Sequence, residues 1–239
     1  MPSASHVEIN ESSKGQPEDV RADFQTLLRE IHSAKIGTLN SLHPRGRVFL
    51  TEGEPAAGVY LLRAGRASVS ISSHEGKIVI LRTAQPGDVL GLSSALRNSS
   101  YDTTIKTLEP CRTDFIQRAE LLRLVQQSHA GAQAISKILS RELIQLTDRT
   151  RSLVLPQTAS ARLAKLLLDW ASEHGEQDQS DARIDKVFTH EEIAQMICST
   201  RETVTRLLAI FSRRGVIQIT NDSILILDQA ELKKISFAM

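Results

Sequence analysis

Between Leu42 and Thr113 the chain alternates short apolar runs with turn residues, a texture typical of a β-rich domain. The apolar and β-branched runs cover residues 47–50, 59–62, 67–72 and 77–83. Turn-forming residues separate them at positions 53–55, 64–65, 74–76 and 86–88. Polar and apolar residues alternate over 68–72, which puts one face of a strand against a core and the other in water. This spacing predicts a compact β-roll or barrel; a β-sandwich without a ligand is the alternative.

Two segments precede this region. Residues 1–22 hold many Ser, Glu, Gln and Pro residues, a composition that buries too little apolar surface to offset the entropy lost on ordering, so we expect a flexible tail. Phe24, Leu27 and Ile31 then recur at the spacing of a short helix. We therefore assign residues 23–128 to one unit, made of this helix and the β-roll.

Residues 129–155 form an almost unbroken stretch of helix formers that ends at Pro156. A helix of this length exceeds the usual packed helix. Apolar residues at every third or fourth position form a continuous seam, which includes Ile135, Leu139, Leu143 and Leu146. Such a seam favours pairing with a second copy of the chain, so we expect a homodimer. The alternative is a long helix that packs on its own domain.

The start of a helix-turn-helix is marked between residues 189 and 199. Thr189 is a good N-cap, and Glu191 and Glu192 place negative charge in the first turn of the helix that follows. A polar break at Cys198 and Ser199 ends that helix. Two short helices joined by such a break make a helix-turn-helix.

The second helix should cover about residues 200–211, with Thr200 as its cap. Its apolar positions fall on one face, at Val204, Leu207 and Leu208. Arg201, Glu202 and Arg206 point away from that face, in the first two turns, where a recognition helix meets base edges. Arginine can bond guanine O6 and N7, and glutamate can accept from cytosine N4, so this face suits a G·C-containing half-site. Exposed charges on a helix are otherwise usually a solvated face.

In the rest of the C-terminal unit, residues 156–239, the sequence predicts a helix, a loop and a wing. A helical pattern covers 159–173 and an acidic polar loop covers 174–185, and two β-runs around a turn at residues 221–222 predict a wing. Arg213 and Arg214 lie just before the wing and can contact phosphate, which positions a protein on DNA without reading sequence.

Composition narrows the function classes. The net charge of +1 is too small to identify a nucleic-acid binder, and Cys111 and Cys198 lack the spacing of a disulfide framework, a zinc site or an iron–sulfur cluster. We find no Ser/His/Asp grouping, metal-ligand spacing or phosphate-binding glycine loop, so we do not expect an enzyme, a metal site or a cofactor.

No apolar run reaches the length of about eighteen residues that a membrane span needs, and the first residues lack the pattern of a secretion signal, so we expect a cytoplasmic protein.

Together the β-roll, long helix and winged helix resemble the CRP/FNR superfamily of bacterial regulators over about Leu42 to Leu227. The stretch 200–206, Thr-Arg-Glu-Thr-Val-Thr-Arg, is similar to that family's recognition-helix motif. The resemblance implies an α+β protein with a cyclic-nucleotide-binding-like domain, a homodimer, a palindromic DNA operator and RNA polymerase as a partner. It also implies base reading by Arg201, Glu202 and Arg206, and phosphate contacts from Thr189, Thr200 and Thr203. A ligand-binding or adaptor protein whose winged helix contacts other proteins is the alternative.

The same resemblance implies an effector pocket around residues Gly91, Leu92, Ser93, Asp102 and Thr103. In cyclic-nucleotide sensors Glu stands at the Leu92 position and Arg at the Asp102 position. A carboxylate with no arginine beside it disfavours a buried phosphate, so we do not expect cyclic AMP to bind.

Other departures concern the turn and the sensor chemistry. Cys198 replaces the glycine of the family's helix-turn-helix turn, and the cysteine cluster of oxygen sensors is missing. Haem sensing stays an alternative because five histidines lie within the first 129 residues, although a lone histidine is more often a surface or core residue. They are His6, His32, His43, His74 and His129. The sequence therefore identifies no effector.

Overall fold

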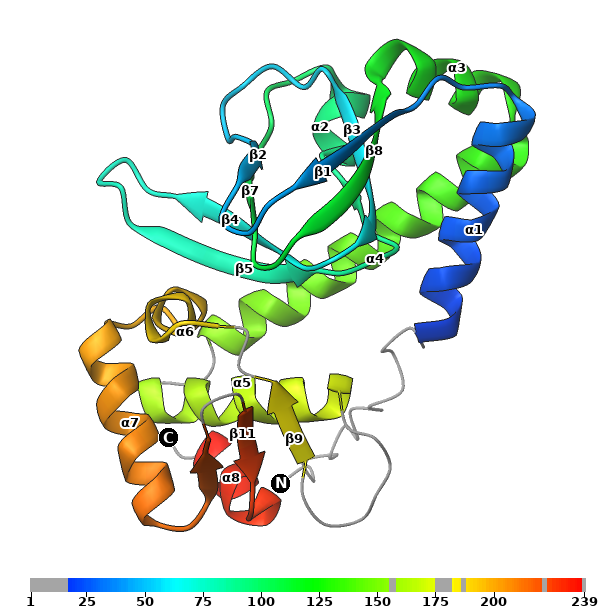
Figure 1. Cartoon of the computed structure of the whole chain (residues 1–239). Helices are drawn as coiled ribbons and strands as arrows, with labels where there is room; N and C mark the ends of the chain where they lie inside the picture. The colour runs from blue at the N-terminus through cyan, green and yellow to red at the C-terminus, as the bar shows by residue number, and fades with distance from the viewer. Residues whose placement is uncertain (1–16, 155–157, 175–181, 186–187, 221–222, 238–239) are drawn as a thin grey trace, which may run out of the picture.

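A computed structural model of the chain describes residues 17–154, 158–174, 182–185, 188–220 and 223–237 (Figure 1). An N-terminal β-roll unit and a C-terminal unit of helices around a small sheet are joined by one long helix, α4 (His129–Val154). This α+β architecture confirms the fold class predicted from the sequence.

Two four-stranded antiparallel sheets make the β-roll. One sheet has the order β1-β8-β3-β6 and the other the order β2-β7-β4-β5. The first sheet contains β1 (Leu39–His43), β3 (Gly58–Ala64), β6 (Val89–Leu90) and β8 (Cys111–Gln117). The second contains β2 (Val48–Leu50), β4 (Ala67–Ser72), β5 (Ile78–Ala84) and β7 (Thr104–Thr107). The four predicted apolar runs correspond to β2, β3, β4 and β5.

Short helices frame the roll. Helix α2 (Leu92–Arg97), which was not predicted from the sequence, lies between β6 and β7, and α3 (Arg118–Gln127) follows β8. Inward-facing side chains of both sheets form one core with these helices, and its fully buried members include Leu50, Leu61, Leu62, Ile105, Ile116 and Leu121.

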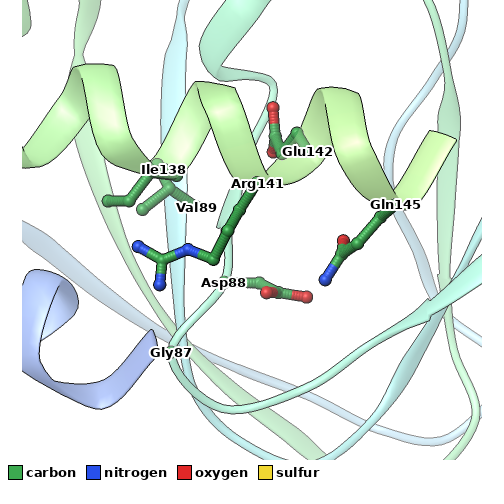
Figure 2. A pocket seen from close by; sticks show the side chains of 7 residues that line it. All are labelled: Gly87, Asp88, Val89, Ile138, Arg141, Glu142 and Gln145. Carbon is green, nitrogen blue, oxygen red and sulfur yellow. The ribbon is translucent and has the colours of Figure 1, made fainter. Parts of the chain in front are cut away.

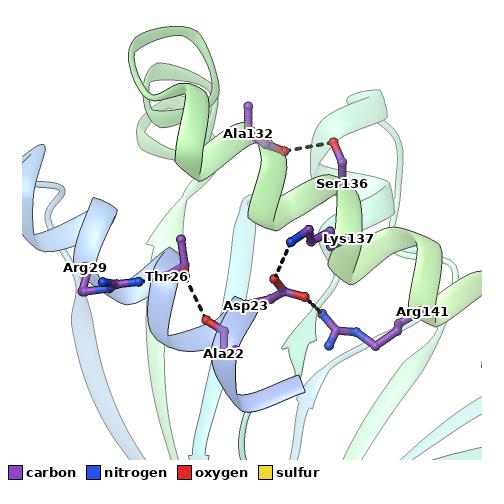
Figure 3. A network of polar contacts seen from close by, with 8 residues as sticks. All are labelled: Ala22, Asp23, Thr26, Arg29, Ala132, Ser136, Lys137 and Arg141. Atoms are coloured by element: carbon purple, nitrogen blue, oxygen red, sulfur yellow. Dashed lines mark hydrogen bonds and ion pairs between the residues drawn. The ribbon is translucent and has the colours of Figure 1, made fainter. Parts of the chain in front are cut away.

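Helix α1 (Pro17–Ser33) lies alongside α4 (Figure 1). It begins at Pro17, so it reaches into the range that the sequence assigns to the tail; residues 1–16, including His6, lie outside the described residues. Asp23 of α1 pairs with Lys137 Nζ at 3.5 Å and with Arg141 Nη2 at 2.5 Å (Figure 3). These pairs and the buried face of α1 attach the helix to the long helix.

Burial changes along α4. Ile135 is 3 % exposed and belongs to the core of its own β-roll, and Leu139 packs against the same core. Leu143 and Leu146 are 66 % and 49 % exposed. The predicted seam is therefore divided in the single chain: Ile135 is packed into the core of its own β-roll, while Leu143 and Leu146 are uncovered.

The C-terminal unit has its own core, built on α5 (Ala159–His174) and α8 (Gln229–Ser236). A three-stranded sheet with the order β10-β11-β9 packs beside them; its strands are β9 (Ala182–Asp185), β10 (Ile217–Ile219) and β11 (Ser223–Ile226). Trp170 stacks on Phe188 with ring centroids 4.7 Å apart. Strand β9 corrects the expectation of an uninterrupted polar loop over residues 174–185.

The two units touch where β5 meets the helix-turn-helix. Ile80 of β5 is 2 % exposed and lies in the core of the C-terminal unit. Arg149 of α4 donates from Nη2 to the carbonyl of Ile80 at 3.0 Å and also to the carbonyl of Met196. One guanidinium thus links the β-roll, the long helix and the helix-turn-helix. In the part of the chain that the structure describes, no helix has the length and apolar character needed to cross a membrane.

Candidate functional site

The first helix of the motif, α6 (His190–Met196), starts at a capping box. The hydroxyl of Thr189 accepts from the Glu192 amide at 3.2 Å, and the Glu192 carboxylate accepts from the Thr189 amide at 2.8 Å. Both bonds satisfy amides that a helix start leaves unpaired. The buried residues of α6 are Ile193, Ala194 and Met196, so the polar start of the helix stays at the surface.

The turn between the two helices contains a residue with left-handed backbone. Cys198 has a φ of 49°, a conformation that glycine adopts without a steric penalty. The amide of Ser199 donates to the carbonyl of Ala194 at 2.9 Å, which closes the turn. Cysteine therefore replaces the expected glycine and keeps the backbone conformation of the turn.

The second helix, α7 (Arg201–Arg213), presents two different faces. Thr200 caps it by accepting from the Thr203 amide at 3.3 Å. Its buried residues are Val204, Leu208 and Phe211. Arg201, Glu202 and Arg206 are exposed, and Figure 1 shows α7 at the outer edge of the C-terminal unit. The packing face fixes the helix, and the opposite face of its first two turns is open.

Glu202 is held in its ionised form. Backbone hydrogen bonding, followed by the hydrogen bond with the Thr200 side chain, lowers the pKa of its carboxyl group. An ionised carboxylate can only accept hydrogen bonds. Contact with the amino group of cytosine, which is a hydrogen-bond donor, requires such an acceptor.

The threonines assigned to phosphate contacts lie at the starts of the two helices. The hydroxyl of Thr203 lies 3.1 Å from that of Thr200, so the two hydroxyls stand together at the start of α7. Helix starts also attract anions through their partial positive charge. His190 was missed from the sequence: its Nδ1 lies 2.9 Å from the hydroxyl of Thr205 on α7, and this contact across the turn had no local sequence signal.

Arg213 and Arg214 lie at the opposite end of α7. Both are exposed, and at about 1.5 Å per residue Arg213 is about 18 Å along the axis from Arg201. Arg213 comes two helical turns after Arg206, so both arginines lie on the same face of α7. Arg214 is the C-cap residue of the helix. The two arginines are followed by β10 and β11, the predicted wing strands; the turn at residues 221–222 lies outside the described residues.

The predicted effector residues surround α2. A Cβ at Gly91 would lie 2.7 Å from Tyr101 Cε1, and Leu92 is 1 % exposed, within the core. Asp102 accepts from Ser93 Oγ at 3.2 Å and from Arg97 Nη2 at 3.3 Å. Thr103, next in the chain, is half-buried. The structure thus brings these residues together, with a carboxylate that is already paired inside the chain.

A half-buried ion-pair cluster lies between the β-roll and α4. Arg82 of β5 contacts Asp88 at 2.5 Å and Glu142 of α4 at 3.7 Å. Figure 2 shows Gln145 of α4 extending toward Asp88. Both residues line a cavity of about 20 Å³, which has room for about one water molecule. This cluster was not predicted, because nothing in the local sequence distinguishes these charged residues from surface residues.

This cluster predicts a pH-dependent stability. Burial raises the pKa of Glu142 from 4.5 to about 7, against the opposing effect of Arg82. The folded chain therefore binds more protons than the unfolded chain between these values, so stability falls as pH rises from about 4.5 to about 7. Because a glutamine side chain does not ionise, we expect Glu142→Gln to stabilise the protein at pH 7.5, by an amount on the order of 3 kcal/mol, and to have little effect at pH 4.5.

The measurement is denaturant unfolding of the wild type and of Glu142→Gln at both pH values. Asp148→Asn is the matched control, because Asp148 is on the same helix with a side chain that is 52 % exposed. A stability difference between Glu142→Gln and the wild type that is the same at both pH values would contradict the assignment.

Comparisons with known proteins agree with this geometry. Residues 42–128 match the model of the cyclic nucleotide-binding domain, and residues 161–235 match that of the Crp-like helix-turn-helix domain. A "CRP-like cAMP-activated global transcriptional regulator" of Mycobacterium tuberculosis is 28 % identical over 191 residues, which is 80 % of this chain and 85 % of that protein. The "Global nitrogen regulator" of Synechococcus elongatus is 27 % identical over 217 residues, 87 % of this chain and 95 % of that protein.

Solved structures show the same fold. The structure of FixK2 from Bradyrhizobium japonicum superimposes with a TM-score of 0.72 and 20 % identity, covering 85 % of this chain and all of that one. The two matched domains cover both halves of the chain, in the order cyclic nucleotide-binding domain and then helix-turn-helix. The chain belongs to the CRP/FNR family of DNA-binding transcription regulators, with a cyclic-nucleotide-binding-type domain followed by a Crp-like helix-turn-helix.

Proposed function

We propose that the protein works as a homodimer that reads a palindromic DNA operator through α7. The observation that carries this proposal is the division of α7 into a packing face and an open face with Arg201, Glu202 and Arg206. The family is defined by DNA binding through this motif; the assignment of base contacts to these three residues is the proposed step.

In the proposed complex the two kinds of contact are separate. Arg201 and Arg206 bond guanines and Glu202 accepts from cytosine, so we expect a half-site similar to TGTGA, as the motif's resemblance suggests. Phosphates are contacted by the residues at the helix starts and at the far end of α7: Thr189, Thr200, Thr203, Arg213 and Arg214. Phosphate contacts set the register of the protein on DNA, and base contacts select the sequence.

The dimer supplies the symmetry of the operator. Leu143 and Leu146 are large exposed apolar residues on one helix, and a second copy of α4 can cover them. In a two-fold dimer the recognition helices lie about 34 Å apart, one turn of DNA. This is the spacing that an inverted repeat with half-sites one helical turn apart provides.

The domain division that we propose is a tail (1–22), the β-roll unit (23–128), the dimerisation helix (129–155) and the DNA-binding unit (156–239). Cyclic AMP is not the effector in this proposal, because Leu92 is buried and the carboxylate of Asp102 occupies the position where a cyclic phosphate needs a cation. The nearby guanidinium of Arg97 is already paired with that carboxylate. Bound at promoters, the dimer would work in the cytoplasm and contact RNA polymerase.

The test is selection of bound fragments from genomic DNA, followed by extraction of the common motif. We expect an inverted repeat with half-site centres about 10–10.5 base pairs apart, and an affinity that falls steeply with salt because phosphate contacts release counterions. A motif without two-fold symmetry would contradict the dimeric interpretation. Failure to enrich any DNA would favour a winged helix that contacts proteins.

A further inference from the structure

A second cavity opens in the β-roll, and all the residues that line it belong to this N-terminal unit. Its volume is about 330 Å³, within the lower range for small-molecule sites. Strands of both sheets line it: β1, β3 and β8 from one, β2 from the other. The residues of β1 that face it alternate along the strand, at Leu39, Ser41 and His43.

Four aromatic rings form a continuous row along this cavity. His43 stacks on Phe49 with centroids 4.6 Å apart, Phe49 meets Tyr60 edge-on at 5.1 Å, and Tyr60 lies 4.8 Å from Phe115. All four side chains are half-buried. The apolar residues in the core of the same domain, by comparison, are almost completely buried. Partly open aromatic faces are surfaces on which a planar ring can stack.

A positively charged side chain, that of Arg47, lies among the residues that line the cavity. Arg47 is exposed, and its backbone is fixed by Thr107, whose hydroxyl accepts from the Arg47 amide at 2.9 Å. Within the described residues, its guanidinium forms no ion pair, and no Asp or Glu lines the cavity. Burial, and then the charge of Arg47, lowers the pKa of His43, so the imidazole is mainly neutral at pH 7 and the guanidinium supplies the charge.

The polar atoms nearby suit one class of ligand. The hydroxyl of Tyr60 and that of Ser41 are further groups at the lining, and His43 Nε2 lies 3.0 Å from Thr113 Oγ1, which fixes the ring. An arginine fork binds a carboxylate in bidentate geometry. The site therefore offers partly open aromatic rings, set at angles to one another, with a partner for a carboxylate beside them.

We infer that this cavity is a binding site for small planar aromatic carboxylates, with the ring on the Phe49–Tyr60 row and the carboxylate on Arg47. The site is separate from the DNA-reading face, so the inference goes beyond the proposed function and its test needs no DNA.

The probe is naphthoate, titrated into the full-length chain by calorimetry at pH 7. We expect saturable binding with a dissociation constant of about 1 mM or below, as befits a ligand of this size. Naphthalenemethanol, which keeps the rings without the charge, and cyclohexanecarboxylate, which keeps the charge without the aromatic ring, should each bind about tenfold more weakly.

Variants separate this site from general attraction of anions. Arg47→Gln should weaken naphthoate binding about tenfold, and Phe49→Leu should weaken it by a similar factor. Arg112→Gln is the matched control: Arg112 pairs with Leu42 on the opposite face of the sheet and is exposed, so binding should not change. Absence of saturation up to about 10 mM, equal losses in Arg47→Gln and Arg112→Gln, or equal binding of cyclohexanecarboxylate would each overturn the inference.

Discussion

Replacing Arg201 by Ala should abolish most discrimination at one guanine of each half-site. A bidentate arginine–guanine pair contributes about 1–3 kcal/mol of discrimination, and a dimer makes this contact twice. If the two losses add, operator affinity falls roughly 30-fold to 10⁴-fold. Arg201 is exposed in the first turn of α7, so the substitution removes no core packing and the variant should stay folded.

The measurement is a binding titration against the operator, against operators with a changed guanine, and against unrelated DNA at two salt concentrations. Arg213→Ala is the control, since Arg213 is an exposed arginine of the same helix beyond the expected base-reading turns. It should weaken binding to all DNA alike and reduce the salt dependence. If Arg201→Ala lowers affinity equally for operator and unrelated DNA, Arg201 is a backbone contact and the base-reading assignment fails.

The helix-turn-helix could be predicted from the sequence because its determinants are local. Thr189 and Thr200 each bond an amide three residues further along, and the packing residues of α7 repeat at helical spacing. Capping and periodicity need no knowledge of distant contacts. The contact between His190 and Thr205, by comparison, depends on how the two helices cross.

The elements that escaped prediction depend on partners far along the chain. Strand β9 has four residues and exists through its pairing with β11, and a short strand at the end of a polar loop has no strong pattern of its own. The ion pairs of Arg82 require β5 and α4 to pack together. Charged residues are usually exposed, so sequence reasoning places such a cluster on the surface.

The seam of α4 illustrates the limit of periodicity. Spacing identifies which residues share a face, but it does not identify what covers them. The core of the β-roll covers Ile135, whereas Leu143 remains 66 % exposed in the single chain. The dimerisation hypothesis is therefore best tested on the second half of the seam.

Replacing Leu143 and Leu146 together by Glu should convert the dimer into a monomer at micromolar concentration. Burying a leucine contributes about 1.5–3 kcal/mol, and the double variant removes four such side chains from a two-fold interface. A loss on the order of 6 kcal/mol raises the dissociation constant of the dimer about 10⁴-fold, since each 1.4 kcal/mol is a factor of ten. The introduced carboxylates also repel each other across the two-fold axis.

Sedimentation velocity reports the assembly state, circular dichroism reports whether the fold is kept, and an operator titration reports the consequence. A folded monomer should bind operator little better than unrelated DNA, because it can occupy one half-site at a time. Leu42→Glu is the control: it introduces the same chemical change at a leucine that is 81 % exposed on β1, and it should leave the dimer and its DNA affinity unchanged. A dimer that persists in the double variant, or a wild type that is monomeric at micromolar concentration, would show that this face of α4 is not the interface and that the symmetry of the operator must have another origin.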